Sequence, residues 1–146
     1  MGPKIELNYV VSVRDDAASG KVQVTLDRSG TLWLTDRELA DELATSLKDG
    51  ELVAVEYVDQ AKQIREVFPP VVDRIVALSE AGPEEPVEVQ AMKRPSLLEL
   101  RRDHPRFDEL YEFLKECHRD KAETALAVFP GSRPIQDARL LSDKPK

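Results

Sequence analysis

Cysteine, glycine and long apolar runs are scarce in this sequence of 146 residues. Its one cysteine, Cys117, excludes an internal disulfide framework and suits a reducing compartment. No stretch reaches the roughly 18 consecutive apolar residues of a membrane helix, and no charged and apolar leader stands at the start. These absences lead us to expect a cytoplasmic protein that does not enter a membrane.

The motifs that usually carry enzyme chemistry are missing as well. The six glycines are scattered and form neither a dinucleotide fingerprint nor a phosphate-binding loop, and no serine stands in a nucleophile elbow. His104, Cys117 and His118 are the only nitrogen and sulfur side chains that commonly bind metals strongly, and neighbours on a helix point about 100° apart. We therefore expect no catalytic residue, no metal, no cofactor and no enzymatic activity.

Acidic residues outnumber basic ones, giving a formal net charge of -7. An acidic surface repels phosphate backbones, which disfavours general nucleic-acid binding. One segment departs from this balance, because it sets five basic residues against only Glu99 and Asp103. Gathered near a helix start, these side chains would hold a phosphate or carboxylate group; the alternative is a solvated rim neutralised by neighbouring acids. The candidate anion- or partner-binding residues are Lys93, Arg94, Arg101, Arg102 and Arg106.

The first half of the chain is predicted to form strands around one helix. Thr35 followed by Glu38 is typical of a capping box, and Gly50 stands where a left-handed residue ends a helix. A helix over about 36–48 is expected between them, with an apolar stripe that recurs at the helical spacing. That stripe consists of Leu39, Leu43 and Leu47. Alternating and β-branched segments predict the strands, which are residues 5–15, 21–26, 31–34, 52–58 and 63–68.

The second half repeats this order after Pro69-Pro70. A helix is expected to begin at Asp103-His104-Pro105, where proline is tolerated in the first turn. Its predicted apolar face consists of Phe107, Leu110, Tyr111, Leu114 and Cys117. The strands are expected at residues 73–79, 87–92, around Leu97, 125–129 and 135–141. Residues 142–146 are expected to form a disordered tail.

Matching residues at regular offsets indicate an internal duplication. Valines and a leucine of the first strands match at an offset of 65: Val11, Val22, Val24 and Leu32 with Val76, Val87, Val89 and Leu97. The helices match at an offset of 67, with residues 41–43 and 47–48 falling on 108–110 and 114–115. Further along, Ala54-Val55 falls on Ala127-Val128 and Ile64 on Ile135.

The predicted fold class is therefore α+β, with two tandem βββαββ repeats in the element order of an OB-fold, a small five-stranded barrel. The expected units are residues 1–70 and 71–141. The alternative is one pseudo-symmetric α+β domain formed by both repeats, because units of this size bury little surface alone.

Three functions are compatible with these patterns. The first is a non-enzymatic binding or adaptor protein that recognises a protein or peptide through a sheet face or the groove between its repeats. The second is a single-stranded nucleic-acid or anion-binding protein that uses the arginine cluster. The third is a small enzyme without a familiar motif. A protein partner is the expectation, nucleic acid is disfavoured by the net charge, and a homo-oligomer is compatible with the sequence.

Overall fold

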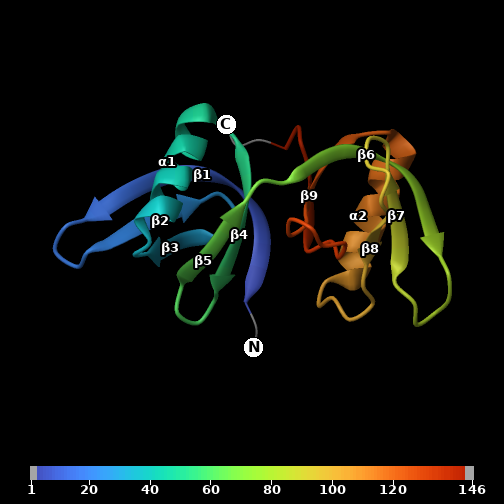
Figure 1. Cartoon of the computed structure of the whole chain (residues 1–146), viewed down its shortest axis with the longest axis horizontal. Helices are drawn as coiled ribbons and strands as arrows, with labels where there is room; N and C mark the ends of the chain where they lie inside the picture. The colour runs from blue at the N-terminus through green and yellow to red at the C-terminus, as the bar shows by residue number, and fades with distance from the viewer. Residues whose placement is uncertain (1–2, 144–146) are drawn as a thin grey trace. The chain divides into compact units, whose positions relative to one another are not determined.

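The protein is described by a computed structural model covering residues 3–143, which contains ten strands and two helices (Figure 1). This confirms the expected α+β class. The chain divides into two compact units, one ending at Pro69 and the other spanning Pro70–Asp143. Of the tail expected at 142–146, residues 144–146 lie outside the described part.

The first unit is a closed barrel with strand order β1-β2-β3-β5-β4. All neighbouring pairs are antiparallel except β3 and β5, which pair in parallel where Trp33 meets Gln63. One helix, α1, lies between β3 and β4 in the chain. The elements are β1 (Lys4–Asp16), β2 (Lys21–Leu26), β3 (Gly30–Leu34), α1 (Arg37–Asp49), β4 (Leu52–Val58) and β5 (Gln63–Phe68).

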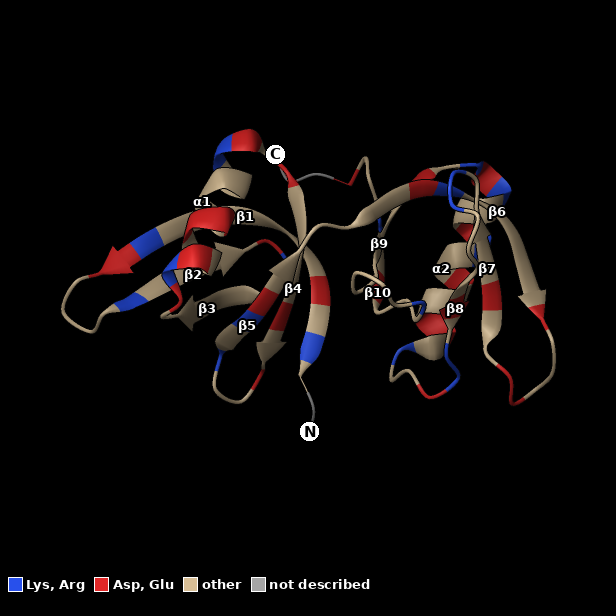
Figure 2. Cartoon of the chain, viewed as in Figure 1, with Lys and Arg blue, Asp and Glu red and all other residues tan. Residues whose placement is uncertain are grey.

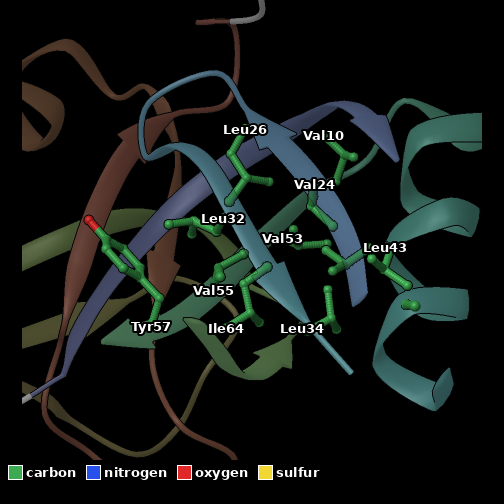
Figure 3. Close-up of a cluster of buried hydrophobic side chains, with 12 residues drawn as sticks. Val10, Val24, Leu26, Leu32, Leu34, Leu43, Val53, Val55, Tyr57 and Ile64 are labelled. Atoms are coloured by element: carbon green, nitrogen blue, oxygen red, sulfur yellow. The ribbon is translucent and has the colours of Figure 1, made fainter. Parts of the chain in front are cut away.

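Alternating side chains fill the barrel. On β2, Val22 and Val24 point inward while Gln23 between them is exposed, as the period of two requires. Figure 3 shows buried side chains of the strands filling the barrel, with Leu43 of α1 at one side of this cluster. The core of the first unit consists of Val10, Val22, Val24, Leu26, Leu32, Leu34, Ala40, Leu43, Val53, Val55, Tyr57 and Ile64.

Helix α1 begins one residue later than its predicted capping box. Asp36, rather than Thr35, is the N-cap, and its carboxylate accepts from the amides of Glu38 (2.9 Å) and Leu39 (3.3 Å). A carboxylate at this position satisfies two free amides and favours the positive end of the helix dipole. The helix ends as predicted at Gly50, which has φ 66°.

The second unit is a five-stranded sheet with strand order β10-β9-β6-β7-β8. An isolated parallel bridge joins Glu99 of β8 to Pro134, just before β10. The elements are β6 (Val71–Glu80), β7 (Val87–Ala91), β8 (Leu98–Leu100), α2 (Phe107–Asp120), β9 (Glu123–Ala127) and β10 (Asp137–Leu140). The core consists of Ile75, Val87, Val89, Leu98, Leu100, Leu110, Leu114, Cys117, Leu126, Val128, Ile135 and Ala138.

Helix α2 presents the predicted face to this core. Leu110, Leu114 and Cys117 are buried, and Phe107 and Tyr111 pack against the cluster while partly exposed. The helix starts at Phe107, not at Pro105, and its N-cap Arg106 makes no side-chain capping bond. The ring of His104 instead fixes the residue that precedes the helix, because its Nδ1 accepts from the Arg106 amide at 3.0 Å.

Candidate functional site on the second unit

The five predicted basic residues fall into two groups at opposite ends of β8. Lys93 and Arg94 lie in the connection before this strand, whereas Arg101, Arg102 and Arg106 lie in the connection that follows it. Figure 2 shows basic residues in two separate connections of the second unit. The sequence places all five within one short segment, but a strand between them carries the two groups apart.

Arg102 binds the β6–β7 connection to the start of α2. Its guanidinium donates to the Glu80 carboxylate at 2.7 Å and to the carbonyl oxygens of Glu85 at 2.9 Å and Gly82 at 3.2 Å. It also lies 4.9 Å from the centroid of the Phe107 ring, a cation–π contact. The hydrogen bond from Arg102 holds the pKa of the Glu80 carboxyl below its ordinary value. This arginine is therefore already occupied by groups of its own unit.

Arg106 binds a buried carboxylate. Its Nη2 donates to Asp137 at 2.6 Å, and the Asp137 side chain is only 3% exposed. The other terminal nitrogen donates to Glu109 at 3.1 Å. His104 supports the same junction, because its Nδ1 is an acceptor, which leaves Nε2 to donate to the Gln136 carbonyl at 2.8 Å. These bonds fix the start of α2 against the segment that leads into β10.

An open hollow of about 470 Å³ lies at the start of α2. It offers positive charge, but Glu109 lines it too and is bonded to Arg106. Among residues 3–143, Arg101 pairs only with Asp103, at 3.5 Å on the surface. An external anion would therefore compete with carboxylates already in place. The lining residues are Arg102, His104, Pro105, Arg106, Phe107, Asp108 and Glu109.

Lys93 and Arg94 differ from this group, because within residues 3–143 neither forms an ion pair. The Lys93 amide donates to the carboxylate of Asp73 at 2.8 Å, and the amide of Arg74 donates to its other oxygen at 2.7 Å. Asp73 is only 3% exposed. A buried carboxylate thus holds the chain after β7 against β6.

A strip of exposed apolar side chains lies beside these basic residues. Val72, Val76 and Met92 are 38%, 45% and 54% exposed, and we call them, together with Arg74 between them, the β6 strip. Residues 72, 74 and 76 alternate with the inward-facing Asp73 and Ile75. The Met92 amide donates to the Arg74 carbonyl at 2.9 Å, which brings the end of β7 next to β6.

Sequence reasoning missed the β6 strip. The run Ile75-Val76-Ala77-Leu78 is apolar throughout, so period-two alternation cannot assign its faces. A register shift between Ile75 and Ala77 in the pairing with β7 leaves Val76 outside the ladder. Such a bulge changes the direction of a side chain, and it follows from pairing with a strand distant in sequence.

A polar network lies inside the first unit. Glu6 accepts from the Tyr57 hydroxyl and, at 2.8 Å, from that of Ser29, which itself accepts from the Asn8 amide at 2.7 Å. Burial, followed by the Glu6 carboxylate, raises the pKa of Tyr57 well above its ordinary value. Across residues 3–143, no buried polar side-chain atom lacks a hydrogen-bond partner. The network therefore joins β1, the β2–β3 turn and β4 within the barrel.

Trp33 lies on the outer surface of the same barrel, since its neighbours Leu32 and Leu34 are buried inside. Its indole nitrogen donates to the Ala61 carbonyl at 2.8 Å, and the Lys21 ammonium lies 4.2 Å from the ring centroid. An outward aromatic ring beside a cation is a surface that can stack with a base or another planar group.

Comparison with family models, with curated proteins and with solved structures found no match. In the part of the chain that the structure describes, no helix is long and apolar enough to cross a membrane. The same residues contain no group of three or more histidine, cysteine or acidic side chains that could hold a metal ion.

Proposed function

We propose that this chain is a non-enzymatic binding protein that recognises a protein or peptide partner through the outer face of β6. The observation that carries this proposal is the exposure of Val72, Val76 and Met92 around one short stretch of sheet. Covering apolar surface is favourable, and apolar side chains beside charged groups are typical of the centre and rim of a protein interface.

Recognition on this face uses side chains. Strand β6 pairs with β7 along one part of its length and with β9 along another. Val72 and Arg74 belong to the stretch paired with β9, where the backbone is engaged by residues 123–126. The proposed recognition uses the outward side chains of β6 and needs no addition of a partner strand to the sheet.

Several titratable side chains are already bonded within their own unit, which supports a binding role over an enzymatic one. Arg102 and Arg106 are bonded to carboxylates of their own unit, and both ring nitrogens of His104 are engaged with the backbone. Burial raises the pKa of the Cys117 thiol above its ordinary value, which disfavours the nucleophilic thiolate.

We further propose that the two units are copies of one OB-like unit. Hydrogen bonds at matched positions support this. The Asn8 side chain accepts from the Arg28 amide at 3.0 Å, and the Asp73 side chain accepts from the Lys93 amide at 2.8 Å. The two acceptors are 65 residues apart in the sequence, and so are the two donors. Register shifts fall at Val11 in the first unit and at its counterpart Val76 in the second.

The later elements support the same relationship at larger offsets. The Trp33 amide donates to the Lys62 carbonyl at 2.8 Å, and the Glu99 amide donates to the Arg133 carbonyl at 3.0 Å. The donors Trp33 and Glu99 are 66 residues apart in the sequence, and the acceptors Lys62 and Arg133 are 71 apart. The left-handed residues that end the two helices, Gly50 and Lys121, are also 71 apart.

This alignment changes the helix match inferred from residue identity. At an offset of 71, Leu43 corresponds to Leu114, whereas the offset of 67 paired it with Leu110. Both Leu43 and Leu114 are fully buried, while Leu47, the earlier match for Leu114, is 38% exposed. The added residues fall mainly between β8 and α2, so the segment with Arg101, Arg102 and Arg106 has no full counterpart in the first unit.

Affinity capture from cells that produce the protein tests the binding role. The bait is the whole chain, compared with a Val76→Ser/Met92→Ser variant. Val11→Ser is the matched control, because Val11 is 52% exposed at the corresponding bulge of the first unit. We expect a partner that the double variant loses and the control retains. Equal recovery by all three baits would contradict the proposal.

A second candidate function, binding of single-stranded nucleic acid, rests on Trp33 and Lys21. Because Trp33 is the only tryptophan, its fluorescence reports directly on stacking at this surface. Titration with oligodeoxythymidylate at rising salt is expected to quench this emission, with affinity falling as salt rises. An unchanged emission at low salt would remove this candidate.

A further inference from the structure

We propose that the occupant of the β6 strip is an acidic peptide segment carrying apolar side chains. This inference rests on the proposed binding function and specifies the chemistry of the partner. It follows from the combination of three exposed apolar side chains with basic residues on the same part of the second unit.

Apart from the inward-facing Asp73, the charged residues within the strip and next to it in sequence are positive. Arg74 lies between Val72 and Val76 on the strand, and Lys93 and Arg94 directly follow Met92. Within residues 3–143, Lys93 and Arg94 form no ion pair, so their charge is available to carboxylates of a partner. The strip therefore carries positive charge, although the net charge of the whole chain is negative.

Arg74 is paired only weakly within its own unit. Its nearest carboxylate oxygen, on Glu123, lies 3.6 Å away, and the two side chains are 48% and 54% exposed. An exposed pair at this distance contributes little to stability, because water screens it and both side chains lose freedom in forming it. A partner carboxylate can therefore replace Glu123 on Arg74.

The apolar part of the strip is aliphatic. Two valines and a methionine provide contact area and, in methionine, an adaptable thioether, but no ring on which a base could stack. A peptide with leucine-like side chains fits this chemistry better than a nucleic acid does. The distance from Val72 to Val76 along an extended strand is about 13 Å, close to two turns of an α-helix, so two apolar side chains of one peptide can reach both.

The strip is particular to the second unit. At the offset of 65, Val72 and Arg74 correspond to Leu7 and Tyr9, which are 0% and 6% exposed. Of the three strip positions on β6, only Val76 has an exposed counterpart, Val11, in the first unit. The first unit thus provides an internal control with the same bulge and no exposed apolar row.

The probe is a fluorescein-labelled peptide of leucine and glutamate, measured by anisotropy against the whole protein. Two matched probes replace leucine by serine or glutamate by lysine. We expect only the leucine and glutamate peptide to bind, with affinity falling at least about tenfold for Arg74→Glu and for Met92→Ser, and unchanged for Val11→Ser. Amide shifts in NMR spectra are expected at Val72, Val76 and Met92.

The other outcomes would overturn the inference. Equal or tighter binding of the leucine and lysine peptide would contradict the inference that the partner is acidic. The proposed binding function would still stand if capture of a partner depends on Val76 and Met92. Binding of oligodeoxythymidylate that is lost in Arg74→Glu would assign the strip to nucleic acid. If no peptide binds and capture is also independent of the strip, the proposed function fails with the inference. Circular dichroism of each variant separates lost binding from lost folding.

Discussion

The buried carboxylate of Asp73 accepts a hydrogen bond from the backbone amide of Lys93 at 2.8 Å. This bond joins β6 to the chain that leaves β7, and it fixes the position of Met92 and Lys93 beside the β6 strip. The same carboxylate accepts from the Arg74 amide at 2.7 Å. One inward side chain therefore determines where the exposed side chains of Met92 and Lys93 lie.

Replacement of Asp73 is expected to destabilise the second unit. Asp73→Ala leaves the amides of Arg74 and Lys93 without this acceptor, which we expect to cost about 1–3 kcal/mol of unfolding free energy in total. Asp73→Asn retains one carbonyl oxygen and is expected to cost less. Urea unfolding monitored by circular dichroism measures both variants. Equal stabilities of Asp73→Ala and the natural protein would contradict the stabilising role of the Asp73 carboxylate.

Lys121→Gly is expected to stabilise the second unit by about 1 kcal/mol. Lys121 ends α2 with φ 53°, a left-handed conformation that is strained for residues other than glycine. The matched change in the first unit, Gly50→Ala at φ 66°, is expected to destabilise by a similar amount. Thermal unfolding compares the two variants, and a loss of stability in Lys121→Gly would show that the lysine side chain makes an unrecognised contribution.

Alkaline pH is expected to weaken the first unit through Tyr57. Burial and the Glu6 carboxylate raise the pKa of Tyr57 above the ordinary value of 10.0. Because the folded pKa is the higher one, this contribution to stability is complete below pH 10.0 and is lost as the pH rises toward the folded value. Unfolding free energies at increasing alkaline pH are expected to fall less steeply for Tyr57→Phe. Parallel curves would contradict the assignment.

Arg106→Ala is expected to cost about 1–3 kcal/mol, because it removes the guanidinium that pairs with the buried Asp137 carboxylate. Arg101→Ala is the control, since Arg101 and Asp103 are 57% and 75% exposed and such pairs contribute about 0–1 kcal/mol. Denaturant unfolding measures the difference. Equal effects of the two substitutions would show that burial of Asp137 does not strengthen its pair.

Cys117 is expected to react slowly with thiol reagents while the protein is folded. The side chain is 2% exposed, and burial raises its pKa, so both access and thiolate content are reduced. Labelling at rising urea therefore reports opening of the second unit, while Trp33 emission reports the first. Rapid labelling without denaturant would show that the α2 face opens in the native protein.

Local patterns predicted much of the architecture. Period-two alternation located β2 and β7, and the apolar spacing with Gly50 located α1, because each signal is contained within a few consecutive residues. The start of α2 was placed too early, at Pro105. There the decisive contact is a histidine ring that also binds Gln136, a residue more than thirty positions away.

The candidate site was less predictable. Proximity in sequence groups Lys93 and Arg94 with Arg101, Arg102 and Arg106, but β8 separates the two groups. The carboxylates that occupy Arg102 and Arg106 come from Glu80 and Asp137. Spacing along the sequence does not predict ion pairs between residues that are more than twenty positions apart.

By itself, then, the sequence determined the types and order of the strands and helices and the excess of acidic charge, since these depend on composition and on neighbours a few positions apart. The tertiary structure alone decided that Asp73 points inward, that Val76 lies outside the ladder at a bulge, and that Arg74 lies beside Met92. Each of these depends on the register between β6 and strands distant in the chain, and a register shift of one residue reverses the face of every side chain.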